Sequence, residues 1–565
     1  MSRRALSALV LSLFVPLVTS LPSLGQTPTF RSNVRVVNLD IVVTDGHGRP
    51  ITGLRPEDIV VTEDGHRQAL ASFEYVRPGA MVTASEHRMP LPPGEFTNLP
   101  DAVPKTVNII VLDLLNSPME NQSDARMQMI LLLRSLPPGR QVALFTLTTR
   151  LNLVQPFTAS SDELIAAANK IELRKSALYQ SEADKQREFD SLFLGYRDSD
   201  ESVTGGIIEA IKQMQVRAVD NRVMLTIDAL RQLARASAVY SGRKNVIWVS
   251  GGFPLLMLTP MGSGGIMSHA VAPSRDRNYE PLVRQVSAQL AAANIAMYPV
   301  DIFGQLTSSA DATTWGSQLA YPEKTAEGYV MVDRAGEVQQ HIADVHSSMQ
   351  KFAEYTGGRA FYNSNDLKSA MQKSMDLGAS YYAVSYRPSN QNFDGRFRKI
   401  EVKIAHRRVQ LAYRRGYYAI LDTAPSEAQI SREMSAALKR ESPPASEIVF
   451  TVKLLPQTDP VTLEYEYSLD GNQFQVTGSE GKPIEARFDL SASAWSSDGK
   501  ATGSVANMVT LPMTADSVAQ YHKAGIRVRQ TLHLTGPVAS LRIAVLDRNT
   551  GRLGSLDVPV ATKVP

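Results

Sequence analysis

The middle of the chain alternates short apolar runs with longer amphipathic segments. The apolar runs have the length and composition of buried parallel strands, and they cover residues 108–113, 246–250, 295–304 and 381–388. Between them, apolar residues recur at helical spacing over residues 119–135, 221–240, 280–294, 338–356 and 366–377. This alternation predicts an α/β fold with a doubly wound, mostly parallel sheet and helices on both of its faces.

Both flanks of this region alternate single apolar and polar residues, as half-buried strands do. Residues 31–77 hold two such runs with Asp-Gly turns at Asp45 and Asp64, which predicts an N-terminal β module. Residues 78–104 are rich in proline and glycine and predict a linker. Residues 397–418 alternate strictly, and we expect them to form a hairpin that packs against the N-terminal β module.

The central domain, with this hairpin at its end, is therefore expected over residues 105–420. Residues 421–446 predict a second linker that contains a short polar helix. Several short strand patterns with turn signals between them predict a C-terminal β-sandwich over residues 447–562.

The first 25 residues have the features of a signal peptide. Arg3 and Arg4 precede an apolar stretch, and Ser23 and Gly25 place small residues where cleavage before Gln26 would need them. An uncleaved anchor is the alternative, but Pro16 interrupts a short core. No later stretch approaches the ~20 apolar residues of a spanning helix. We expect an exported protein, in the periplasm, on the cell surface or in the medium, with no transmembrane segment after cleavage.

Composition narrows the chemistry further. The chain has no cysteine, which excludes disulfides, thiolate catalysis and cysteine-based metal sites. Its 59 basic and 56 acidic residues give a net charge of +3, and no long basic block occurs, so we expect no nucleic-acid partner.

No group of residues in the sequence matches the spacing of a known catalytic motif. The histidines His341 and His346 are five residues apart, which places them about 140° apart on a helix. Ser250 lies in a Ser-Gly-Gly sequence that lacks the nucleophile-elbow spacing, and Ser268 merely precedes His269. We predict no catalytic residue, no cofactor and no enzymatic activity.

A basic cluster follows the predicted strands near residue 400. It offers either a surface for an anionic partner or a solvated strand face that protects a sheet edge, and we favour the solvated face. Its members are Arg396, Arg398, Lys399, Lys403, Arg407, Arg408, Arg414 and Arg415.

Several short motifs, in a fixed order over residues 34–420, resemble the VWFA-related family of exported proteins of Acidobacteria, whose central domain is of the von Willebrand factor type A kind. The motifs are "DIVVTDGHGRPITGLRPEDIVVTEDGHRQALASF", "VLDLLNSP", "SSDELIAAANKI", "SGRKNVIWVSGGFP", "FAEYTGGRAF" and "YYAVSYRP" with the "DGRFRKIEVKI" and "YRRGYY" that follow. The resemblance implies a recognition domain whose loops at the carboxyl ends of the strands meet a protein partner.

Type A domains often hold Mg²⁺ through Asp-x-Ser-x-Ser after the first strand, a threonine before a central helix and an aspartate after the fourth strand. Asp113 and Ser117 match the first and last positions of the Asp-x-Ser-x-Ser pattern, but Leu115 stands at the middle position and Asn116 has the wrong spacing. The threonine position matches Thr226 or, alternatively, Thr204. Gly251, beside Ser250, replaces the second acid. One carboxylate binds Mg²⁺ weakly.

The sequence therefore predicts a non-enzymatic binding or adhesion protein with a degenerate metal site and an unknown protein partner. A magnesium-dependent adhesin with Asp113 and Ser117 as ligands is one alternative, and an envelope hydrolase is another. The predicted binding face comprises Asp113, Asn116, Ser117, Thr226, Ser250, Gly251 and Gly252.

Overall fold

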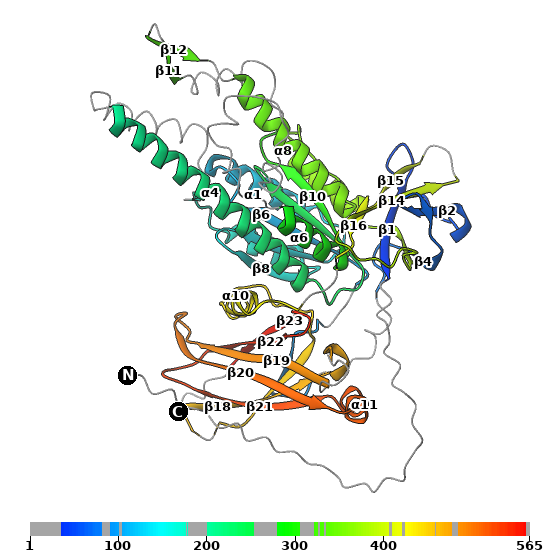
Figure 1. Cartoon of the computed structure of the whole chain (residues 1–565), viewed down its shortest axis with the longest axis vertical. Coiled ribbons are helices and arrows are strands. Elements are labelled where there is room, and N and C mark those ends of the chain that lie inside the picture. The colour runs from blue at the N-terminus through cyan, green and yellow to red at the C-terminus, as the bar shows by residue number, and fades with distance from the viewer. Residues whose placement is uncertain are drawn as a thin grey trace.

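A computed structural model of the whole chain has an α/β domain with a strand-rich lobe beside it and a second strand-rich lobe below it (Figure 1). The structure describes residues 36–81, 91–100, 104–176, 178, 201–252, 280–304, 321–325, 328–332, 335–405, 409–420, 424–457, 459–476 and 484–560. The predicted signal peptide lies outside these residues.

The α/β domain is built on one five-stranded sheet with the order β10-β9-β6-β7-β8. The strands are β6 (Thr106–Asp113), β7 (Val142–Leu147), β8 (Leu151–Thr158), β9 (Arg243–Ser250) and β10 (Ile295–Asp301). Neighbouring strands are parallel except for β8, which is antiparallel to β7 at one edge. The predicted mostly parallel sheet is confirmed in these strands.

Helices cover both faces of this sheet, because successive residues of a strand point to opposite sides. Ile109 and Val111 of β6 pack on the face covered by α4 (Glu201–Ala236), α6 (Glu280–Ala292) and α8 (Ala335–Thr356). Ile110 and Leu112 pack on the other face, which is covered by α1 (Met119–Arg134), α2 (Ser161–Asn169) and α9 (Leu367–Leu377). The domain is therefore doubly wound, with one apolar core on each face of the sheet.

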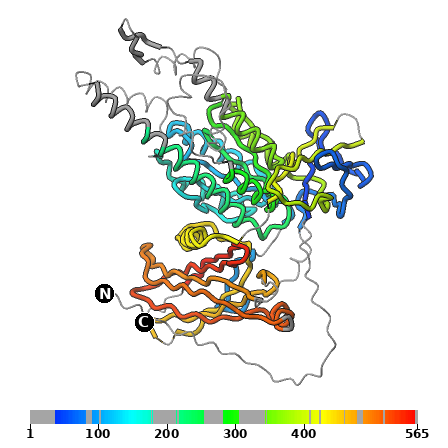
Figure 2. Tube along the Cα trace, viewed as in Figure 1, coloured from blue at the N-terminus to red at the C-terminus, as the bar shows by residue number. Residues whose placement is uncertain are grey.

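The N-terminal strands do not form a module by themselves, because strands from residues 381–418 complete their two sheets. The first sheet has the order β15-β1-β13-β4 and the second β16-β14-β2-β3. Figure 2 shows these two parts of the chain side by side. Their bounds are β1 Val37–Thr44, β2 Ile59–Glu63, β3 His66–Arg67, β4 Leu70–Val76, β13 Tyr381–Tyr386, β14 Phe397–Ile404, β15 Gln410–Ala412 and β16 Gly416–Tyr418, with a short 3-10 helix η1 at Pro56–Asp58.

Two expectations for this lobe have different outcomes. The packing of the 397–418 hairpin against the N-terminal strands is confirmed, since β14 pairs with β2 and β15 pairs with β1. The assignment of residues 381–388 to the parallel sheet is wrong, because β13 is antiparallel to β1 and β4. An apolar run of six residues shows that a strand is buried but carries no signal of its pairing direction.

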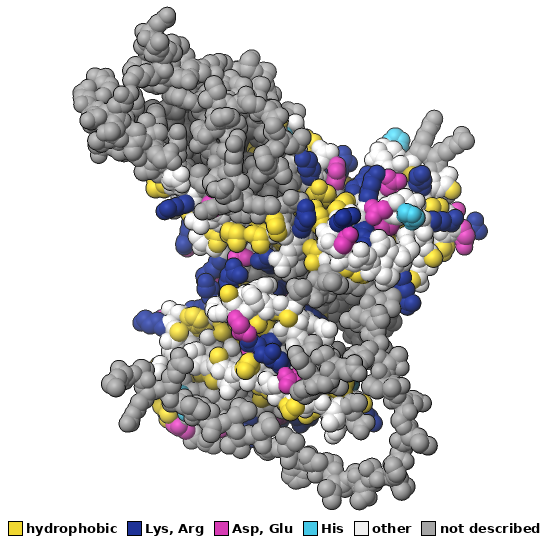
Figure 3. All heavy atoms as spheres, viewed as in Figure 1, with side chains coloured by type: hydrophobic (Ala, Val, Ile, Leu, Met, Phe, Trp, Pro, Cys, Tyr) yellow, Lys and Arg dark blue, Asp and Glu magenta, His cyan; other side chains and the backbone are white. Residues whose placement is uncertain are grey.

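The basic cluster is only partly a solvated face. Arg398 is 3% exposed and pairs with Glu63 at 3.3 Å, and Arg414 donates a hydrogen bond to the carbonyl oxygen of Asn38 at 2.5 Å. Arg396 and Lys399 have exposed side chains, and basic and acidic groups are interspersed over this lobe in Figure 3. Arg407 and Arg408 lie outside the described residues. The expected solvated face is therefore wrong for the buried Arg398, and Arg414 is half-buried.

The lower lobe contains two four-stranded antiparallel sheets that share one apolar core. The first has the order β21-β18-β17-β5 and the second β20-β19-β22-β23. Residues 78–104 are more than a linker, because β5 (Glu95–Thr97) within them pairs with β17. The other bounds are β17 Phe450–Leu454, β18 Thr462–Leu469, β19 Ile484–Trp495, β20 Ala501–Met513, β21 Ile526–His533, β22 Ser540–Asp547 and β23 Leu553–Pro559.

Five further elements complete the described chain. Helix α10 (Glu427–Ala437), in the predicted second linker, packs its apolar side against β22 and β23. Helix α11 (Ala515–Ala524) and the 3-10 helix η4 (Gly471–Gln473) lie beside the lower sheets, and β11 (Tyr321–Thr325) and β12 (Gly328–Val332) form a separate hairpin. Among the described helices, none has the length and apolar character needed to cross a membrane.

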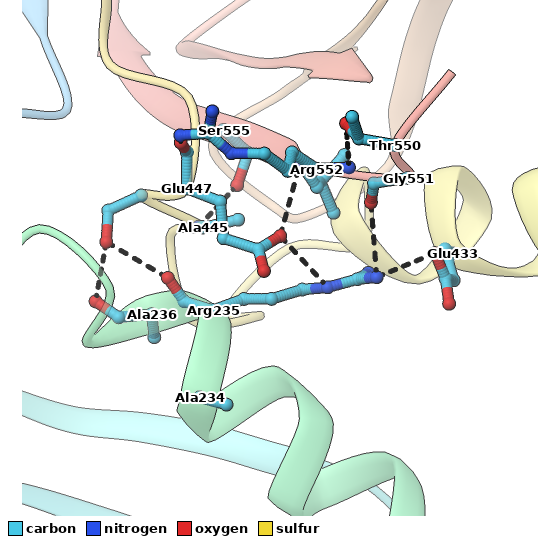
Figure 4. Close-up of polar contacts among 12 residues, drawn as sticks. Ala234, Arg235, Ala236, Glu433, Ala445, Glu447, Thr550, Gly551, Arg552 and Ser555 are labelled. Carbon is cyan, nitrogen blue, oxygen red and sulfur yellow. Dashed lines mark hydrogen bonds and ion pairs between the residues drawn. The ribbon is translucent and has the colours of Figure 1, made fainter. Parts of the chain in front are cut away.

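A buried ionic contact joins the lower lobe to the C-terminal end of α4. Arg235, 8% exposed, contacts Glu433 of α10 at 2.8 Å and Glu447 at 3.3 Å, and donates to the carbonyl oxygen of Gly551 (Figure 4). The hydroxyl of Ser446 donates to the carbonyl oxygen of Arg235, one of the last carbonyls of the helix. The lower lobe thus caps α4 and is fixed to it.

Candidate functional site

The candidate site lies where the strand order of the five-stranded sheet reverses, between β6 and β9. From β6 the chain builds outward to β7 and β8, and then returns to add β9 and β10 on the other side of β6. The crevice between the carboxyl ends of β6 and β9 is the usual ligand position in open α/β sheets. Asp113 is the last residue of β6 and Ser250 is the last residue of β9, so the two side chains meet there.

The carboxylate of Asp113 is fully buried and lies within hydrogen-bond distance of four donors. Its Oδ1 accepts from the backbone N–H of Asn116 at 2.9 Å. Its Oδ2 accepts from the Asn116 amide at 2.9 Å, the indole N–H of Trp248 at 3.0 Å and the Ser250 hydroxyl at 2.9 Å. Three of these donors converge on Oδ2 and one on Oδ1, and the Ser250 hydroxyl shares its single hydrogen with the carbonyl oxygen of Gly252, 2.6 Å away. The protein itself therefore supplies most of the hydrogen bonds that this group accepts.

Asn116 connects this carboxylate to α4. Its Nδ2 also donates to the hydroxyl of Thr226 at 3.2 Å, and its Oδ1 accepts from Nε of Arg222 at 3.0 Å. Thr226 in turn donates to the backbone carbonyl of Arg222, one helical turn earlier. The side chains of Asn116 and Thr226 are 0% exposed. A buried amide and a guanidinium thus complete the polar cluster around Asp113.

The remaining predicted residues join the two loops at this edge. The backbone N–H of Gly251 donates to the hydroxyl of Ser117 at 3.1 Å, and the Ser250 hydroxyl is bonded to the backbone of Gly252. A β-carbon at Gly251 would lie 3.0 Å from the carbonyl oxygen of Asn116 and 3.2 Å from the Phe303 ring. The close approach of the two loops therefore favours glycine, and an aspartate there would displace its neighbours.

All seven predicted residues are therefore brought together, but the five with polar side chains are buried and do not form an open surface. Burial raises the pKa of Asp113 above its ordinary value, and the hydrogen bonds from Asn116, Trp248 and Ser250 oppose that shift. Thr204, the alternative to Thr226, lies on α4, but its side chain is outside the described residues. Within the described part of the chain, the cluster acts as a support that fixes the loops above it.

These residues do not fit a magnesium ion. Mg²⁺ needs oxygen ligands in near-octahedral geometry. The side-chain N–H groups of Asn116 and Trp248 instead direct their hydrogens at Asp113, where a cation would have to sit. The side-chain oxygen of Asn116 accepts a hydrogen bond from the positively charged Arg222. In the described residues, no group of three or more His, Cys, Asp and Glu side chains has the arrangement of a metal site.

A second polar pair at this edge was missed by the sequence analysis. Asp301, the last residue of β10, lies 2.8 Å from Nε2 of His346 on α8, and the His346 ring stacks on Tyr362. The sequence did contain a signal for Asp301, because this acid ends an apolar strand as Asp113 does. Arg222 and Trp248 were also missed, and neither has a sequence pattern that distinguishes it from ordinary helix and strand residues.

Comparisons with known proteins complete the description of the site. No family model matches the chain, and no curated protein matches it. Among solved structures, an aerotolerance-related membrane protein from Bacteroides fragilis is 11% identical over 48% of this chain and 98% of its own, with a TM-score of 0.23. Proximal thread matrix protein 1 from the mussel byssus, with a zinc-occupied MIDAS motif, is 11% identical over 52% of this chain and 50% of its own, with a TM-score of 0.22.

A third similar structure is the ArnB paralog VWA2 from Sulfolobus acidocaldarius, which is 8% identical over 89% of this chain and 74% of its own, with a TM-score of 0.20. The identities and TM-scores are too low to transfer a residue role, a ligand or a partner. Membership in the Acidobacterial family stays a prediction.

Proposed function

We propose that this chain is an exported, non-enzymatic binding protein that presents the carboxyl edge of its five-stranded sheet to a protein partner without a metal ion. One observation carries the proposal, namely the four internal donors that surround the Asp113 carboxylate. In type A-like domains that need an ion, that carboxylate would have to bind the ion. Here an internal amide and the Arg222 guanidinium take the place of a cation.

The proposed recognition surface above this cluster includes one exposed apolar side chain. Met119, at the start of α1, is 43% exposed directly after the loop that contains Asn116 and Ser117. Glu120 and Asn363 are also exposed near the edge. An exposed apolar side chain among polar ones supports contact with a protein, since such contacts combine an apolar centre with a polar rim.

One specific observation favours the hydrolase alternative. A histidine held by a buried aspartate, as His346 is by Asp301, is the arrangement that orients a general base. A nucleophile or an activated water would have to complete it, and the neighbours of the pair include the Tyr362 ring, which stacks on His346, and the backbone N–H of Phe303, which donates to Asp301. The binding function therefore accounts for more of this edge.

The test uses the purified chain without its predicted signal peptide as bait in an envelope extract, with and without EDTA. We expect a partner whose capture is unaffected by EDTA and is lost in Met119→Lys. Met127→Lys is the matched control, because Met127 lies on the same helix, is 55% exposed and is two turns from the edge. Capture that requires Mg²⁺ would support the adhesin alternative, and capture unaffected by Met119→Lys would move the recognition site elsewhere.

The enzymatic alternative is tested separately, with esterase and peptidase substrates. Activity that disappears in both His346→Gln and Asp301→Asn would replace the binding function with a hydrolytic one. Activity that is unchanged by both substitutions would point to a contaminating enzyme.

A further inference from the structure

A small polar cavity lies at the opposite end of the α/β domain, where the N-terminal strand lobe meets it. The cavity has a volume of about 20 Å³, and its polar lining comprises Asn38, Asp40, Arg243, Asn294, Thr356 and Arg414. Asn38 and Asp40 come from β1, Arg243 begins β9, and Thr356 ends α8. The cavity therefore lies between two parts of the fold and near the amino ends of β9 and β10.

Positive charge exceeds negative charge around this cavity. Arg243 and Lys244 are each 2% exposed, and Arg414 is half-buried. Burial raises the pKa of Asp40, and the charges of Arg243, Arg414 and Lys244 oppose that shift. Asp40 is the carboxylate that faces these three cations. Glu63, the nearest further acid to Arg414, is already paired with the buried Arg398. The three cations, of which Arg243 and Lys244 are buried and Arg414 is half-buried, thus face one carboxylate, and an uncompensated buried charge is costly.

The hydrogen bonds of the two arginines leave donors available. Nη2 of Arg243 donates to Tyr298 and to the carbonyl oxygen of Gly357, whereas its Nη1 is 3.9 Å from Asp40, too far for a hydrogen bond. Nε of Arg414 is buried and has no hydrogen-bond partner among the described residues. A buried guanidinium donor without an acceptor indicates that something else accepts its hydrogen.

We propose that this cavity binds one small monovalent anion, such as chloride or formate, between Arg243 and Arg414. The volume suits an occupant of about one or two water molecules in size, which favours a small anion over phosphate esters and larger carboxylates. Water could accept the free hydrogens, but it would leave the excess charge in place. Because Arg414 and Asp40 belong to the strand lobe and Arg243 to the α/β domain, the anion joins these two parts of the fold.

The experiment is a titration of the chain with chloride, followed by ³⁵Cl NMR linewidth, at an ionic strength held constant with sodium gluconate. Gluconate is too large for the cavity. We expect saturable broadening that formate reverses by competition. Binding should weaken at least tenfold in Arg414→Gln, and it should be unchanged in the control Arg396→Gln, because the Arg396 side chain is 86% exposed.

The variant Asp40→Asn gives an independent and opposite result. Removing the competing carboxylate should tighten chloride binding several-fold, so the proposal remains testable even if Arg414→Gln does not fold. Broadening that does not saturate, equal affinity in the wild type and Arg414→Gln, or unchanged or weaker binding in Asp40→Asn would each show that the cavity holds only water. None of these outcomes depends on the partner bound at the other end of the sheet.

Discussion

Replacement of Asp113 by asparagine tests whether hydrogen bonds or a metal ion hold the candidate site together. The amide keeps the shape of the carboxylate but places an NH₂ group where one oxygen accepted a hydrogen bond. With its carbonyl oxygen toward Trp248 and Ser250, the NH₂ group faces the backbone N–H of Asn116. One buried donor then loses its acceptor, and three hydrogen bonds lose the contribution of the charge.

The unsatisfied donor costs about 2 kcal/mol, and each weakened hydrogen bond costs about 1 kcal/mol. Removing a buried charge offsets about 2 kcal/mol of this loss. We therefore expect Asp113→Asn to lower the free energy of unfolding of the α/β domain by about 3 kcal/mol. The same loss should occur in EDTA and in millimolar Mg²⁺, because no ion takes part.

Urea unfolding followed by Trp248 fluorescence measures this loss at the site itself, since the Trp248 indole donates to Asp113. The other two tryptophans, Trp315 and Trp495, are replaced by phenylalanine in all variants so that the signal comes from the α/β domain. Asp376→Asn serves as the control, because its carboxylate is 52% exposed and contributes little through its ion pair with Arg140. A loss below about 1 kcal/mol in EDTA, together with Mg²⁺ stabilisation of the wild type alone, would refute the reasoning.

Three further predictions concern other buried groups. Arg235→Met leaves Glu433 and Glu447 buried without their cation, so it should destabilise the contact between α4 and the lower lobe by about 3–5 kcal/mol, seen as faster hydrogen exchange at residues 442–448. Gly251→Ala should cost about 1–3 kcal/mol in urea unfolding, because its β-carbon meets Asn116 and Phe303, whereas Gly252→Ala, with open space around it, should cost less. Burial lowers the pKa of Lys244 to about 8. The unfolded chain therefore binds more protons between pH 8 and the ordinary lysine pKa of 10.5, and stability should rise with pH across that window by up to about 1.4 kcal/mol per unit, a slope that Lys244→Met removes.

The doubly wound sheet could be predicted because its signals are local. Apolar runs and helical spacing define the elements, and polar residues at strand ends identify the edge where side chains meet. That logic brought Asp113 and Ser250 together from separate parts of the sequence, and the resemblance to type A domains added Thr226. Asp301 carried the same strand-end signal and would have been found by applying it to every strand. Its partner His346 depends on how α8 crosses β10, which a single sequence does not specify.

Other features could not be predicted, or were predicted wrongly, because they depend on contacts between distant segments. β5 joins the lower lobe through pairing with β17, more than 350 residues later in the chain. For Arg398, the alternation of buried and exposed positions along β14 was a usable signal, but the expectation of a solvated face did not follow it. Arg398 shares the parity of Ile400 and Val402 along β14, so alternation already placed it on the buried side. Its charge suggested solvent, but Glu63 on the paired strand allows burial.

The continuity of α4 gives the molecule a mechanical connection between its two ends. Arg222 and Thr226 hold the candidate recognition edge, and Arg235 holds the lower lobe, about 20 Å away along one uninterrupted helix axis. A helix transmits axial load with little extension, because its backbone hydrogen bonds run along that axis. A force applied by a partner at the edge is therefore carried directly to the ion contacts of Glu433 and Glu447, and only secondarily through the loops.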